Sequence, residues 1–89
     1  MKINIYVMEE RWVIVGVVTA RSACGMKTTL GKSATVRVWG TSQGLGELAR
    51  SGPLGGTRLD AEPEGVVINE RFVMRIIPCD MEAWKKWTQ

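Results

Sequence analysis

Two apolar stretches at the start of the chain constrain the fold more than any other feature. Residues Lys2–Met8 alternate strictly, with isoleucine and valine on one face and polar or larger side chains on the other. Such alternation predicts a half-buried β-strand. After a short polar turn at residues 9–11, residues 12–20 are apolar on both faces of a strand. Together the two stretches predict an antiparallel hairpin.

The rest of the chain predicts an α+β, mainly β fold: a small antiparallel sheet or partly open barrel of about five strands with two short helices. Glycine within a strand often marks a bulge, so we expect the third strand to bend near Gly31. A chain of 89 residues is expected to form one domain, residues 1–89. The remaining expected elements are strands at 27–39, 66–69 and 71–77 (the last two separate, or one strand kinked at 69–70), helices at 43–50 and 81–87, and a loop at 51–65.

The first predicted helix is short and contains Gly44 and Gly46. Each glycine weakens a helix by about 1 kcal/mol relative to alanine, so packing must hold this one. Its inner stripe is expected to be Leu45, Leu48 and Ala49. In the second helix Asp80 is expected to act as the cap, and the tryptophans are expected to pack rather than to bind a ligand.

The doubly apolar second strand also bears on assembly. Leaving one of its faces in water would forfeit roughly 4–9 kcal/mol, which is comparable with the stability of a whole domain. Two short helices cover both sides of a sheet poorly, so we expect a homo-oligomer. The alternative is a strongly curled sheet that covers itself as a barrel.

Composition limits the chemistry of the chain. It has no histidine, only two distant cysteines, and a net charge of +3. We therefore expect no catalysis, no metal site and no cofactor. No apolar run is long enough to cross a membrane, and the start of the chain does not match a signal peptide. We expect a cytoplasmic protein with reduced thiols and no membrane partner.

Two nucleotide-binding motifs are incomplete. Residues 25–33 resemble a phosphate loop, but five residues separate the glycines where that motif requires four. Residues 44–49 match the GxGxxA form of the dinucleotide fingerprint, but no parallel sheet surrounds them. We expect an ordinary turn at the first of these segments and a short helix at the second.

The best candidate site follows the third strand. Arg37 and Trp39 share one face of an alternating strand, so a guanidinium and an indole can together hold a flat anion. The alternative is that Trp39 fills the core beside the helix. Amides near Thr41 and Ser42 open the helix, where phosphate is favoured, although these residues can equally act only as caps. Trp12 is the second candidate for stacking a base.

A glycine-rich loop supplies the last candidates. Thr57 ends the segment Gly55-Gly56-Thr57, and Arg58 follows it. An arginine on such a loop can close over a bound phosphate as a clamp. The alternative is a solvated arginine at the surface.

Three segments, around Arg37 and Trp39, around Leu45–Ala49, and from Ile76 to Cys79, resemble a family of short tailed-phage proteins of unknown function. The likeness covers about half of the chain, and it departs at Gly40-Thr41, where the family tends to have a second aromatic. The resemblance implies a phage accessory protein in the cytoplasm of an infected bacterium. Such proteins often disable host defences.

Three functional hypotheses follow. The first is a non-catalytic homo-oligomer that binds and sequesters a small phosphate-bearing, nucleotide-derived immune signal through Trp12, Arg37, Trp39, Thr41, Ser42, Thr57 and Arg58. The second is a protein that binds single-stranded nucleic acid with the same residues. The third is a phosphodiesterase-like enzyme that cleaves such a signal.

Overall fold

The computed structural model describes residues 2–89 and is mainly β, which confirms the expected class. The six strands in chain order are β1 (Lys2–Met8), β2 (Val13–Arg21), β3 (Lys27–Val38), β4 (Arg58–Glu62), β5 (Val66–Asn69) and β6 (Val73–Pro78). The α-helix and the two 3₁₀ turns are α1 (Leu45–Ser51), η1 (Glu9–Arg11) and η2 (Glu70–Phe72).

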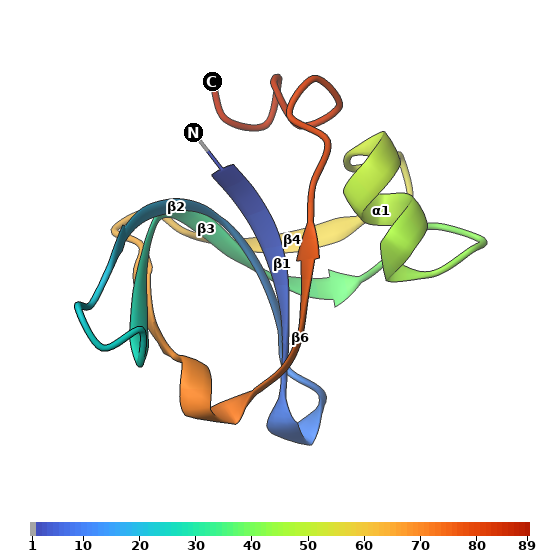
Figure 1. Cartoon of the computed structure of the whole chain (residues 1–89). Coiled ribbons are helices and arrows are strands. Elements are labelled where there is room, and N and C mark those ends of the chain that lie inside the picture. Colours follow the sequence, from blue (N-terminus) through green and yellow to red (C-terminus); the bar gives the residue numbers. More distant parts are fainter. Residues whose placement is uncertain (1) are drawn as a thin grey trace.

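One antiparallel sheet holds all six strands, in the order β4-β3-β2-β1-β6, with β5 also paired to β3. The first part of β3 pairs with β5 and the second part with β4. The pairing of β2 with β3 shifts register where Gly31 lies, so the expected bulge is confirmed. At this point β2 and β3 arch over, and the sheet becomes strongly curved (Figure 1).

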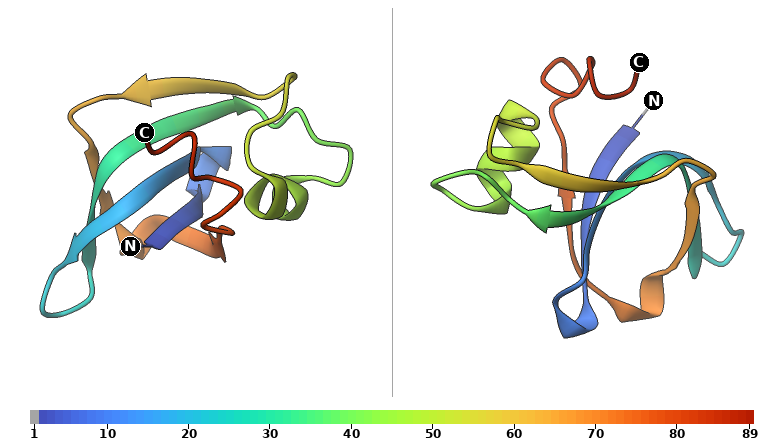
Figure 2. Two further views of the ribbon diagram at one scale, coloured as in Figure 1. Left: turned by 90° about the horizontal axis from the view of Figure 1, so that it is seen from above. Right: turned by 180° about the vertical axis from the view of Figure 1, so that it is seen from behind.

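The curl leaves the sheet open between β5 and β6, because β6 pairs with β1 and β5 pairs with β3. The turn η2 joins the two strands across this opening (Figures 1 and 2). Of the two expected alternatives, the structure shows two separate strands with η2 between them rather than one kinked strand, and the last strand begins at Val73 rather than at Arg71.

One side of the sheet, which we call the closed face, lies under α1 and the C-terminal segment 80–88. Its side chains are apolar and buried, and they include Ile3, Ile5, Val13, Val15, Ala34 and Val36. The expected helix stripe of Leu45, Leu48 and Ala49 packs on them, as does Trp84. The helix, which contains Gly46 and follows Gly44, is thus held by packing, as expected.

The C-terminal segment is joined to α1 by hydrogen bonds. Trp84 Nε1 donates to the carbonyl oxygens of Leu48 and Ala49 at 3.2 and 3.1 Å, and the amide of Asp80 also donates to Ala49. These bonds satisfy carbonyls that the end of a helix leaves free. Gly52 follows the helix with φ of +79°, and a Cβ there would lie 2.3 Å from the carbonyl oxygen of Ala83. Glycine therefore permits the close approach.

The other side of the sheet, which we call the concave face, is covered by the curl itself. Tyr6, Leu30 and Ile68 form its buried cluster. Both faces of β2 are consequently covered within one chain. As expected of such short elements, α1 and the C-terminal segment cover only the closed face, and the curled alternative accounts for the burial on the other face. Self-association stays a prediction that needs other support.

Three sequence-based boundaries are corrected. Residues 58–62, expected in a loop, form β4, an edge strand whose largely polar and exposed side chains carry little apolar signal. The helix begins at Leu45 rather than at Gln43, with Gly44 as its cap residue. Residues 81–88 form successive turns rather than a helix.

The expected cap is nevertheless present in that C-terminal segment. The Asp80 carboxylate accepts hydrogen bonds from the amides of Glu82 and Ala83. A segment this short has little helical stability of its own. Its path follows the anchoring of Trp84, whose ring meets that of Trp87 edge-on at 5.3 Å between centroids. The prediction that these tryptophans pack is therefore confirmed.

Among residues 2–89, no helix has both the length and the apolar character that crossing a membrane would require.

Candidate functional site

One hollow, lined largely by residues of the concave face, has a volume of about 460 Å³, within the range of small-molecule sites. We call it the concave cavity. It is lined by residues from β1, β2, η2, β6 and the segment after β6: Lys2, Ile3, Asn4, Tyr6, Val18, Arg21, Glu70, Ile76, Pro78, Cys79 and Met81. None of its polar residues is among the candidates that the sequence indicated.

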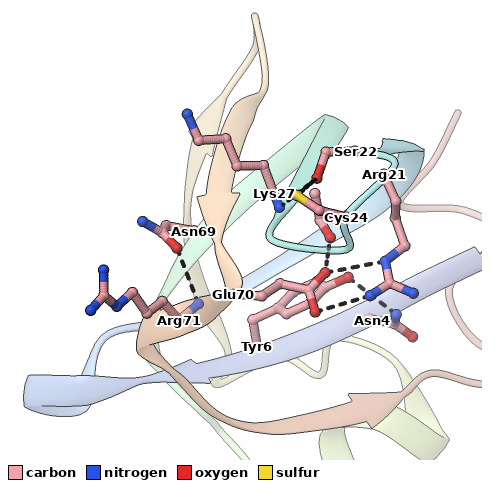
Figure 3. Close-up of polar contacts among 10 residues, drawn as sticks. Asn4, Tyr6, Arg21, Ser22, Cys24, Lys27, Asn69, Glu70 and Arg71 are labelled. Atoms are coloured by element: carbon pink, nitrogen blue, oxygen red, sulfur yellow. Dashed lines mark hydrogen bonds and ion pairs between the residues drawn. The ribbon is translucent and has the colours of Figure 1, made fainter.

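A clamp of polar side chains closes one wall of this cavity (Figure 3). Arg21 donates through Nε and Nη2 to the two carboxylate oxygens of Glu70, each at 3.2 Å. The fully buried hydroxyl of Thr28 also donates to Glu70. Since these three residues lie on β2, β3 and η2, the clamp ties η2 to the ends of β2 and β3 beside the loop that joins them, where the amide of Glu70 also donates to the carbonyl oxygen of Met26.

Tyr6 and Asn4 lie at the same cavity. Tyr6 is only 2% exposed, and its hydroxyl oxygen accepts a hydrogen bond from Asn4 Nδ2 at 3.3 Å (Figure 3). Among residues 2–89, no acceptor takes the Tyr6 hydroxyl proton, and no carboxylate pairs with the Lys2 ammonium. The cavity thus presents hydrogen-bond donors that the protein itself does not use.

The sequence carried a signal for this site. On β1, the residues Lys2, Asn4 and Tyr6 alternate with the apolar residues of the closed face. Such a face is normally turned to solvent, and only the curl of the sheet makes it one wall of the concave cavity. The periodicity predicts correctly which residues share this side of β1. It does not predict what lies opposite them.

A second hollow, of about 480 Å³, contains two of the predicted residues. It is lined by Arg11, Trp12, Val13, Thr35, Val36, Arg37 and Asp60, and we call it the Trp12–Arg37 groove. Trp12 is 60% exposed, and Arg37 makes an ion pair with Asp60 at 3.3 Å. Both partners of that pair are more than half exposed, and such pairs contribute little stability.

A strained turn precedes the exposed indole of Trp12. Glu10 and Arg11 both have positive φ, +62° and +70°, although neither is glycine. Residues in this region of φ cost about 1–3 kcal/mol each, and such strain gathers at functional sites. The turn between β1 and β2 therefore carries strain next to the groove.

Trp39 lies outside the residues that line this groove. Its indole is 43% exposed, so it is not sealed in the core, and its edge lies over Gly44. Its carbonyl accepts a hydrogen bond from Thr57 Oγ1 at 2.7 Å. The same Thr57 oxygen accepts from the amide of Leu54, so this hydroxyl holds a corner of the chain. Arg37 and Trp39 are thus not joined in one hollow.

The corner depends on Gly40. A Cβ there would lie 2.2 Å from the amide nitrogen of Thr57, and the residue has φ of +70°. Only glycine fits this conformation and this close approach.

The expected anion site at the start of α1 is already occupied by a carboxylate. Glu47 accepts a hydrogen bond from the amide of Gln43 at 2.8 Å and from the Ser42 hydroxyl at 3.3 Å. The Thr41 hydroxyl donates to the carbonyl of Gly44. Thr41 and Ser42 therefore order the entry to the helix.

Arg58 is also engaged locally. Its Nη1 donates to the carbonyl oxygens of Gly55 and Thr57 at 3.1 and 3.2 Å. The guanidinium folds back on the turn that precedes β4 instead of reaching over either hollow.

The two cysteines are free and differ in environment. Burial raises the pKa of the Cys79 thiol to about 12. At the exposed Cys24 a side-chain hydrogen bond with Ser22 lowers the thiol pKa, together with a backbone hydrogen bond from Met26. Within residues 2–89 no three cysteine or carboxylate side chains converge as a metal site would require.

No family model, no curated protein and no solved structure matches this chain.

Proposed function

We propose that this protein is a non-catalytic binding protein, and that it holds a small phosphate-bearing, nucleotide-derived molecule in the Trp12–Arg37 groove. The observation that carries the proposal is the pairing of an exposed indole with two guanidinium groups, those of Arg11 and Arg37, in one hollow. A nucleobase stacks on the indole, and stacking of this kind is worth about 1–3 kcal/mol. The phosphate binds to the guanidinium forks.

The ion pair between Arg37 and Asp60 is compatible with this role. Both groups are solvated, so a phosphate can replace the carboxylate at small energetic cost. Asp60 then competes with the ligand for the Arg37 guanidinium, so anions that bind this group weakly do not displace the carboxylate. The groove volume of about 480 Å³ suits a molecule of nucleotide size.

Self-association belongs to the same proposal, on a different support. Phe72 and Met74 are large apolar residues that remain exposed on η2 and β6. Among residues 2–89, β6 pairs with no strand other than β1, so its other edge is available to a second copy.

The biological context rests on the resemblance to short tailed-phage proteins. In that context the bound molecule is an immune signal of the infected bacterium, such as a cyclic dinucleotide or an ADP-ribose derivative. The protein then acts in the host cytoplasm by withholding this signal from its effector, without cleaving it.

The test is to incubate the purified protein with cyclic dinucleotides, cyclic ADP-ribose isomers and short oligonucleotides, and then to analyse what heat denaturation releases. We expect an intact small molecule. A cleaved product would instead indicate the phosphodiesterase. Retention of oligonucleotides with an affinity that falls steeply with salt would indicate the single-strand binder.

Matched variants locate the site. Trp12→Ala is expected to weaken binding at least about fivefold, because the stacking surface is lost. Arg37→Gln is expected to weaken it as well, whereas Arg50→Gln, an exposed arginine on α1, is the neutral control. If Trp39→Ala abolishes binding while Trp12→Ala does not, the ligand binds at the Gly40 corner and the proposed groove is wrong.

A further inference from the structure

The concave cavity has donors that neither the fold nor the proposed nucleotide site uses. The Tyr6 residue is only 2% exposed, and among residues 2–89 its hydroxyl proton has no acceptor. Asn4 donates one amide hydrogen to the Tyr6 oxygen and has a second one available. An anion in this cavity would therefore find two donors within one wall.

The charges at this cavity favour an anion. Lys2 and Arg21 contribute two positive charges and Glu70 contributes one negative charge, which leaves a net charge of +1. Both oxygens of Glu70 are already occupied, by Arg21 and by Thr28. The carboxylate is therefore neutralised within the clamp, and the Lys2 ammonium is left without a partner in the described part of the chain.

The remaining wall of the cavity is apolar. Val18, Ile76 and Met81 line it, and Ile76 and Met81 are exposed in the absence of any occupant. Methionine adapts its shape to apolar ligands more readily than branched side chains do. A hollow with donors at one end and flexible apolar side chains beside them matches a molecule with an acidic head and a hydrocarbon body.

We propose that the concave cavity binds a small amphipathic carboxylate. The carboxylate accepts hydrogen bonds from the Tyr6 hydroxyl and the Asn4 amide and pairs with Lys2. Its hydrocarbon body packs on Val18, Ile76 and Met81. This site is distinct from the Trp12–Arg37 groove, with which it shares no residue.

Octanoate is the probe for the test, titrated into the full chain by calorimetry and followed by amide chemical shifts of β1 and η2. We expect saturable binding with shifts at Asn4, Tyr6 and Glu70. Affinity should rise about fourfold for each added methylene from hexanoate to octanoate, because each buried methylene contributes a constant increment. Octanol and octylamine, which lack the carboxylate, should bind at least about tenfold more weakly.

Two variants keep the test decisive. Tyr6→Phe removes only the hydroxyl and should weaken octanoate binding about tenfold. Lys2→Gln changes an exposed side chain, so it should fold normally and also weaken binding. Lys86→Gln and Arg37→Gln are controls outside the cavity and should leave octanoate binding unchanged.

Two results would overturn the proposal. One is equal binding of octanol and octanoate, since the donors would then have no role. The other is unchanged octanoate affinity in both Tyr6→Phe and Lys2→Gln. Neither result bears on the nucleotide proposal, whose variants lie elsewhere.

Discussion

The two faces of the same sheet differ in kind. On the closed face, alternate residues of β1, β2 and β3 meet α1 and Trp84 in a wholly apolar layer. On the concave face, the residues between them surround a smaller buried cluster, a polar clamp and a cavity. A single strand, β1, supplies isoleucines to one face and Lys2, Asn4 and Tyr6 to the other.

Because of this difference, we expect the two faces to contribute unequally to stability and to ligand binding. A closed apolar layer holds the fold together, because burial of hydrocarbon is its main favourable term. A face that carries unused donors contributes less to folding and has groups left for a ligand. The stability of the protein should therefore depend mainly on the closed face, and binding in the concave cavity on the donors of the concave face.

The largest expected effect is on the closed face. Trp84 is fully buried, and its Nε1 donates to the last carbonyls of α1. Trp84→Ala is expected to lower the free energy of unfolding by about 3–5 kcal/mol, measured by urea denaturation. The matched control is Trp12→Ala, an exposed indole, which should change stability by no more than about 0.5 kcal/mol. Equal losses in the two variants would remove the distinction between core and surface tryptophans.

The second effect is on the clamp of the concave face. Glu70→Ala leaves the buried Thr28 hydroxyl without its acceptor and Arg21 without its partner. We expect a loss of about 1–3 kcal/mol in the same measurement. Glu64→Ala, an exposed carboxylate before β5, should have almost no effect. If Glu70→Ala also has none, the clamp does not stabilise the attachment of η2 to β2 and β3.

The last effect appears only at alkaline pH and concerns Cys79, which packs against the core of the closed face and lines the concave cavity. Burial raises the pKa of its thiol from 9.0 to about 12, so the folded protein keeps a proton that the unfolded chain releases near pH 9. Between about pH 9 and pH 12 the unfolded state binds fewer protons, and stability should fall as pH rises.

The measurement follows urea unfolding across this pH range for two proteins. One is the single variant Cys24→Ser, and the other is the double variant that carries Cys24→Ser and Cys79→Ala. The free energy of unfolding should fall more steeply with rising pH in the variant that keeps Cys79. The thiolate absorbance of that variant should also appear only toward pH 12 while the protein is folded. Titration near pH 9 in the folded protein would mean that the thiol opens to the water of the concave cavity.

Much of the fold was predictable where apolar periodicity is strong. The bounds of β1 were predicted correctly, and β2, β3 and β5 were predicted to within a residue or less. The bulge at Gly31 was predictable because glycine has no side chain to pack within a strand and so often marks an irregular position. β4 was missed because an exposed edge strand carries mostly polar side chains, and its regularity comes from backbone pairing with β3.

The candidate site was less predictable. Arg37 and Trp12 do share a hollow, but Arg37 lies on β3 and Trp12 lies between η1 and β2, and no spacing in the sequence brings them together. Thr41, Ser42, Thr57 and Arg58 have the chemistry of an anion site, yet the structure engages each of them in local hydrogen bonds. The residue types of a site can be read in the sequence, but their partners cannot.

The sequence by itself determined which residues lie on which side of each strand and where the chain turns, because these depend on neighbours a few residues apart. Only the tertiary structure decided that the sheet curls upon itself. That curl depends on β3 pairing with two different strands, and such pairings join residues distant in the chain. It turned a polar strand face from solvent toward a cavity, and with it decided where a ligand can bind.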